Sequence, residues 1–131
     1  MNGIVQALKE TGVFYAATVE GDQPRVRPFG GVIDYNGKAY FCTNNTKACF
    51  RQLLANPKTE ICGMKPDGSW VRVSGRLIRE DNDAVRAAFL EASPGLKNRY
   101  SIGDGIFEVF RLEDAVACLY TMGADPVEII E

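Results

Sequence analysis

Three tight-turn signals divide the first half of the chain into short extended segments and constrain its fold more than any other feature. They are Gly21-Asp22-Gln23-Pro24, Asn36-Gly37 and Lys65-Pro66-Asp67-Gly68, and each is flanked by β-branched and aromatic residues. Asn-Gly suits a two-residue hairpin turn because both of its residues tolerate positive φ. The pattern therefore predicts antiparallel hairpins.

Alternating and helical periodicities extend this prediction along the chain. Helices are expected over 3–11, over 46–55 and from Asp81 or Asn82 to the residues before Pro94, and strands over 13–20, 25–35, 38–43, 59–64, 69–79, 105–112 and 115–121. Hairpin-linked strands with a few inserted helices predict a mainly β fold, a small antiparallel barrel with flanking α-helices. The length of 131 residues predicts a single domain over residues 1–131.

Composition excludes several classes of function. A net charge of −2 argues against a nucleic-acid partner. No apolar run approaches the roughly 20 residues of a membrane-spanning helix, so no membrane partner is expected. The N-terminal residues lack the pattern of a secretory signal, which predicts a cytoplasmic protein.

The chain contains no histidine, which limits its chemistry. Ser-His-Asp and Cys-His catalysis and His-ligated haem all need an imidazole. The four cysteines stand far apart in sequence, so they are interpreted as reduced core residues; a zinc site would need all four thiolates to converge, and no metal is predicted. Redox chemistry would then belong to a bound cofactor.

The segment Thr43-Asn44-Asn45-Thr46-Lys47 lies where a predicted strand passes into a predicted helix. Thr46 is expected as the helix N-cap, and the first helical turn offers free backbone N–H groups to a phosphate. Lys47 adds a positive charge and Thr43 a hydroxyl donor. The alternative is that Thr46 only caps the helix and Lys47 is solvated.

A second basic element precedes this segment by one hairpin. Arg25 and Arg27 share a strand face, and the Asn36-Gly37 turn is expected to fold their strand back beside residues 38–43, so that Arg27 and Lys47 approach one anion from two sides. Pro28 removes a ladder hydrogen bond, which predicts a sheet edge or a kink. Trp70, on the same strand face as Arg72, is expected to line a ligand cleft or a subunit interface, or simply to lie on a half-exposed strand.

The segments RVRPFG, NG, YFCTNNTK, NP and SWVRVSGR follow one another between about Val13 and Tyr120. In order and spacing they resemble the pyridoxamine 5'-phosphate oxidase-like family of FMN-binding split barrels, especially its small nitroimidazole-resistance (Nim)-like members. The resemblance implies a six-stranded antiparallel split β-barrel and a homodimer with FMN in clefts between the subunits.

The same resemblance implies a set of FMN-binding residues: Arg27, Pro28, Phe29, Gly30, Cys42, Thr43, Asn44, Thr46, Lys47 and Trp70. Trp70 stands where the oxidase has a glutamine, and the loop before Lys47 looks one residue shorter. The oxidase's C-terminal substrate-binding segment has no counterpart here, which argues against oxidation of pyridoxamine phosphate itself.

The expected function is that of an FMN-dependent oxidoreductase that transfers hydride at flavin N5 to or from an unidentified small molecule, with NAD(P)H as a candidate electron donor. No residue is identified as a catalytic acid or base. Three alternatives stay open: a non-catalytic flavin-binding or redox-sensing module, a deazaflavin-dependent reductase, and a β-barrel without a cofactor.

Overall fold

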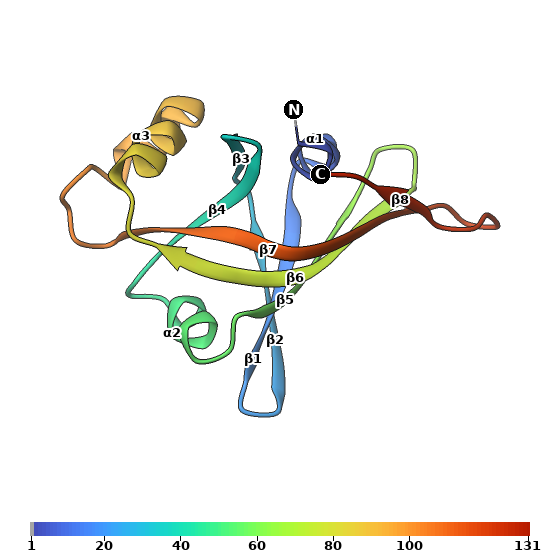
Figure 1. The fold of residues 1–131 in the computed structure, drawn as a ribbon, viewed down its shortest axis with the longest axis horizontal. Coiled ribbons are helices and arrows are strands. Elements are labelled where there is room, and N and C mark those ends of the chain that lie inside the picture. The colour runs from blue at the N-terminus through green and yellow to red at the C-terminus, as the bar shows by residue number, and fades with distance from the viewer. Residues whose placement is uncertain (1) are drawn as a thin grey trace.

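The computed structural model describes residues 2–131, in which runs of consecutive strands are separated by helices (Figure 1). The helices are α1 (Gly3–Thr11), α2 (Ala48–Ala55) and α3 (Asp83–Ala92), followed by the 3-10 helix η1 (Pro94–Asn98). The strands are β1 (Phe14–Glu20), β2 (Gln23–Phe29), β3 (Val32–Tyr35), β4 (Lys38–Asn44), β5 (Lys58–Met64), β6 (Trp70–Glu80), β7 (Phe107–Tyr120) and β8 (Val127–Ile129).

Two of the helices begin at asparagine caps. The Asn2 side chain accepts hydrogen bonds from the backbone N–H groups of Ile4 and Val5, and Asn82 does the same for α3. The predicted Thr46 cap of α2 is wrong: the N-cap is Lys47, which makes no side-chain capping bond, and α2 begins two residues later than expected. Thr46 Oγ1 instead donates to Asn44 Oδ1 at 2.5 Å.

The strands form one antiparallel sheet, which confirms the predicted mainly β fold with flanking helices. The sheet has eight strands rather than six, in the order β2-β1-β5-β6-β7-β4-β3, with β8 paired to β7. The strands predicted at 105–112 and 115–121 are one continuous strand, β7. The predicted break between them is a shift in the pairing register with β6, between Ser74 and Arg76, and the strand continues through it.

Strands β2 and β3 are consecutive in sequence but lie at opposite ends of the strand order. Only Gly30 and Gly31 connect them, so the two edges of the sheet must approach each other at this junction. The sheet therefore curls into a split barrel. The expected pairing of residues 25–29 with β4 is wrong, because β2 pairs with β1, whereas β4 pairs with β3 and β7. Pro28 does lie on an edge strand as predicted.

Two apolar clusters fill the interior. In the larger cluster, residues of α1 and α2 and of the inner faces of β1, β5 and β6 pack around Phe14 and Phe41. In the smaller cluster, α3 packs against β3, β4 and β7 around Phe89 and Phe107. The second cluster places α3 and η1 beside the junction between β2 and β3. Across residues 2–131, no helix combines the length and the hydropathy needed to cross a membrane.

Candidate functional site

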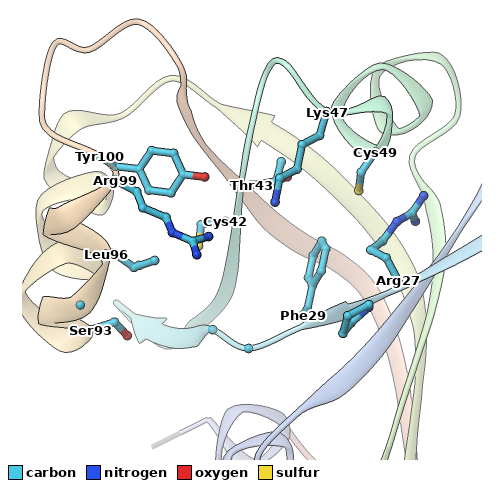
Figure 2. Close-up of a pocket in the computed structure, with 14 residues that line it drawn as sticks. Arg27, Phe29, Cys42, Thr43, Lys47, Cys49, Ser93, Leu96, Arg99 and Tyr100 are labelled. Carbon is cyan, nitrogen blue, oxygen red and sulfur yellow. The ribbon is translucent and has the colours of Figure 1, made fainter.

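A cavity of about 410 Å³ opens where the β2–β3 junction, the end of β4 and η1 meet (Figure 2). Its walls mix cationic, aromatic and small side chains. The lining residues are Arg27, Pro28, Phe29, Gly30, Gly31, Cys42, Thr43, Lys47, Cys49, Ser93, Gly95, Leu96, Arg99 and Tyr100. The curl of the sheet thus creates the cavity, because it brings the end of β2 close to β4.

Arg27 is held by two buried neutral side chains. Its Nη1 donates to the Ala16 carbonyl oxygen (3.2 Å) and to Thr18 Oγ1 (2.7 Å), and its Nη2 donates to Gln52 Oε1 (2.7 Å). Thr18 Oγ1 donates to the same Gln52 oxygen (2.6 Å). These bonds use three of the five guanidinium donors. The other two, Nε–H and one Nη2–H, lie along one edge and form a fork suited to bidentate binding of phosphate or carboxylate.

Lys47 and Thr43 border the same cavity, and Figure 2 shows the Lys47 side chain reaching toward Thr43. Thr43 is 6% exposed, and among the described residues its hydroxyl has no hydrogen-bond partner. The predicted approach of Arg27 and Lys47 to one place is thus present in the structure. The curl of the sheet produces it, rather than the strand pairing that the sequence indicated.

The two asparagines of this loop fix its position from outside the cavity. Asn44 Nδ2 donates to Tyr100 Oη at 2.7 Å. Asn45 Nδ2 donates to Glu108 Oε2 at 2.9 Å and to the Gly105 carbonyl oxygen at 2.7 Å. The loop is therefore tied both to Tyr100, two positions after η1, and to Glu108 in β7. These contacts explain the paired asparagines, although neither side chain lines the cavity.

The two cavity thiols are neutral near pH 7. Burial raises the pKa of Cys42 to about 12, although the nearby Lys47 ammonium opposes the shift. Burial also raises the pKa of Cys49, against the smaller opposing effects of Arg27 and Lys47. A thiolate nucleophile is disfavoured at both positions, so these cysteines contribute apolar, polarisable wall.

Five lining residues come from a segment that sequence reasoning assigned no binding role: Ser93, Gly95, Leu96, Arg99 and Tyr100. Pro94-Gly95 indicated only the end of a helix, and the short η1 that follows has no strong periodic signal. The Tyr100 ring stacks on Phe107 with centroids 4.7 Å apart. The sequence signal that could have indicated this wall was Arg99-Tyr100, an arginine and a tyrosine shortly after the predicted helix end.

Seven of the ten residues expected at an FMN site line this cavity, whereas Asn44, Thr46 and Trp70 do not. Thr46 is exposed in the turn before α2. Trp70 is half-buried at the start of β6, where its ring stacks on Tyr120 with centroids 5.6 Å apart and Arg72 lies over the same Tyr120 ring. Trp70, Arg72 and Tyr120 thus form a surface at the N-terminal end of β6 that is separate from the cavity.

The cavity carries an unbalanced positive charge. Arg27, Lys47 and Arg99 line it, and no lining residue in the described part of the chain is acidic. Elsewhere cations are commonly paired: eight of the 15 lysines and arginines form ion pairs, namely Arg25, Lys38, Lys65, Arg72, Arg76, Arg79, Arg86 and Arg111. Within residues 2–131 none of the three cavity cations has a carboxylate partner, so the cavity favours an anionic ligand.

Comparisons with known proteins agree with this geometry. The sequence model described as "Pyridoxamine 5'-phosphate oxidase" matches residues 3–113. The crystal structure of a NimC/NimA family protein from Clostridium acetobutylicum is 47% identical, with a TM-score of 0.92, over 97% of this chain and 91% of that chain. No functionally curated protein matches the chain.

Two more distant structures share the fold. A heme binding protein from Mycobacterium smegmatis matches with a TM-score of 0.76 at 21% identity, over 97% of this chain and 57% of that one. A FAD-binding protein from Mesorhizobium loti matches with a TM-score of 0.60 at 15% identity, over 88% and 94%. The family match and the 47% identical relative show that the chain belongs to the pyridoxamine 5'-phosphate oxidase-like family, among its Nim-like members.

Proposed function

We propose that this protein binds FMN in the cavity between the β2–β3 junction and η1 and acts as a flavin-dependent oxidoreductase on a small molecule. The observation that carries the proposal is that Arg27 and Lys47, two cations without carboxylate partners among residues 2–131, line one cavity together with Thr43. Family membership supports a flavin, and one structural neighbour is described as FAD-binding.

The residues fit a phosphate monoester. The free edge of Arg27 would take two phosphate oxygens, Lys47 would add a point charge, and Thr43 would donate a neutral hydrogen bond. Pro28, Phe29, Gly30 and Cys42 would border the remaining, less polar part of the cofactor. FMN bound there would supply hydride transfer at N5, and the protein would supply binding, orientation and exclusion of water.

The chain's own groups offer little acid or base chemistry in this cavity. The Cys42 and Cys49 thiols stay protonated near neutral pH because burial raises the pKa of each. We therefore assign no catalytic acid or base, and NAD(P)H is a candidate donor of the electrons.

We further propose a homodimer in which Trp70 contributes to the cofactor site of the partner subunit. Trp70 does not line the cavity of its own chain; it lies at the N-terminal end of β6, where its ring stacks on Tyr120. An aromatic pair that is only half-buried on a strand suits a subunit contact. Asn44 and Thr46 would act indirectly, through the shape of the loop before Lys47.

The first experiment is the visible absorption spectrum of the purified protein after addition and removal of excess FMN. Wild type is expected to retain flavin absorbance, and the double variant Arg27→Ala/Lys47→Ala to lose it. Arg25→Ala/Lys58→Ala is the matched control, because it removes the same charge from two exposed positions that do not line the cavity. A colourless wild type, or equal loss in both double variants, would contradict the assigned site.

Turnover then separates an enzyme from a binding module. Consumption of NAD(P)H by the FMN-loaded protein in the presence of an electron acceptor supports an oxidoreductase, whereas retained FMN without turnover supports a flavin-binding or redox-sensing module. Tighter retention of a deazaflavin than of FMN would support the deazaflavin-dependent alternative instead.

A further inference from the structure

Arg99 brings a third cation to the cavity, from the opposite wall to Arg27 (Figure 2). The phosphate of FMN, bound by Arg27 and Lys47, would leave this charge unused. We propose that Arg99 forms a second anion-binding subsite that takes the carboxylate of a small planar substrate, an inference that rests on the FMN site proposed above.

The backbone that presents Arg99 is fixed by several contacts. The N–H groups of Arg99 and Tyr100 both donate to the Leu96 carbonyl oxygen at 2.9 Å. The next residue, Tyr100, is held on two sides, by the hydrogen bond from Asn44 and by its stack on Phe107. Arg99 is exposed at the cavity mouth, so its guanidinium remains free to meet an incoming ligand on a backbone that is already ordered.

The same end of the cavity is tied to the sheet by a buried ionic network. Arg86 Nε donates to the Phe107 carbonyl oxygen at 2.8 Å, and Arg86 also contacts Glu108, which is 4% exposed. Arg79 Nε pairs with Glu108 at 2.9 Å. The carboxylates in this network are already paired with arginines, and none of them lines the cavity, so they do not compete with a ligand for Arg99.

The neighbouring walls define the rest of the ligand. Leu96 and Tyr100 offer an aliphatic and an aromatic surface, and the Ser93 hydroxyl adds one polar group. A guanidinium prefers the planar, two-oxygen geometry of a carboxylate, and an aromatic wall favours a flat apolar body. These features together select an aromatic or heteroaromatic carboxylate over a neutral molecule of the same shape.

The test measures benzoate and its neutral isostere benzamide by isothermal titration calorimetry on FMN-saturated protein. Wild type is expected to bind benzoate more tightly than benzamide. Arg99→Gln is expected to weaken benzoate binding by about tenfold, the size of a lost charge-assisted hydrogen bond, and to leave benzamide and FMN binding nearly unchanged. Lys97→Gln is the matched control, since it removes an exposed cation two positions away that does not line the cavity.

Each outcome bears on the proposal separately from the flavin assignment. Equal affinity of wild type for the two probes, or an unchanged benzoate affinity in Arg99→Gln, would overturn it. A similar loss of FMN and benzoate affinity in Arg99→Gln would also overturn it, by showing that Arg99 belongs to the cofactor site. If wild type retains no FMN, the proposed function fails, and the same titration without FMN still shows whether Arg99 selects a carboxylate.

Discussion

The neutral cage around Arg27 leads to a sharp prediction about Gln52. This side chain is 7% exposed, and its Oε1 accepts hydrogen bonds from Arg27 Nη2 and Thr18 Oγ1. Gln52→Glu preserves an acceptor of the same shape but adds a negative charge in contact with the guanidinium. The variant is expected to fold normally and to bind FMN more weakly, because Arg27 would then be neutralised before the phosphate arrives.

The magnitudes follow from the contacts. A charge-assisted hydrogen bond is worth about 1.5–3 kcal/mol, so compensation of Arg27 should raise the FMN Kd by about 10- to 150-fold. The ion pair that replaces the amide contact is expected to leave the free energy of unfolding within about 1 kcal/mol of wild type. Gln52→Leu removes the acceptor altogether and should lower that free energy by about 1–3 kcal/mol, since the buried Thr18 hydroxyl and a partly buried N–H group of Arg27 lose their partner.

The assay combines urea unfolding, followed by far-UV circular dichroism, with fluorescence titration of FMN. Gln23→Glu is the matched control, because it introduces the same charge at an exposed position of the same strand as Arg27. Wild-type FMN affinity in Gln52→Glu would refute the reasoning, as would an equal loss in Gln23→Glu, which would reduce the effect to net charge.

Three further predictions concern stability. The pKa of Cys42 in the folded state is about 12 and lies above that of an unfolded thiol, so the free energy of unfolding should fall as the pH rises above about 9. Urea unfolding measured from about pH 8 to 10.5 should show a shallower fall in Cys42→Ala than in wild type. The same dependence on pH in both proteins would count against this reasoning. Glu108→Gln removes a carboxylate that is only 4% exposed and pairs with Arg79, while Arg86 keeps Asp81 and Asp83; it should cost about 1.5–3 kcal/mol in urea unfolding. Asp114→Asn, at an exposed ion pair, should cost less than about 1 kcal/mol, and equal losses in the two variants would contradict the role given to burial. A Cβ at Gly75 would lie 2.9 Å from the Glu113 carbonyl oxygen, so Gly75→Ala should lower the free energy of unfolding by about 1–3 kcal/mol and lower the melting temperature. A Cβ at Gly30 meets no atom within 4 Å, so Gly30→Ala should leave the melting temperature unchanged. A larger drop in melting temperature for Gly30→Ala than for Gly75→Ala would contradict this reasoning.

Local signals predicted most of the elements. The Asn36-Gly37 turn joins β3 to β4, as predicted, and Asn82, one of the two residues predicted as the cap, begins α3. Pro28 correctly indicated an edge strand. Such features depend on a few neighbouring residues, and hairpin turns and helix caps are encoded at that range.

The features that the sequence did not reveal depend on distant partners. Residues 25–35 were interpreted as one strand, although Gly30-Gly31 is a local break signal. Nothing local shows that the two resulting strands lie at opposite edges of the sheet. The wall formed by η1 was missed for a similar reason, since Arg99 reaches the cavity only through the packing of α3 and Tyr100 against β4 and β7. Convergence of Arg27 and Lys47 was predicted, but from an incorrect strand pairing.

Because the junction at Gly30-Gly31 joins the two edges of the sheet, the cavity depends on completion of the barrel. Its walls come from β2, β4 and η1, and the loop at the end of β4 is tied to β7 by the Asn45–Glu108 hydrogen bond, across 63 positions in sequence. Contacts of such long range form slowly because loop closure precedes any gain in energy. The cavity is therefore present only in the completed barrel, and a ligand that binds only there would shift the folding equilibrium toward that state.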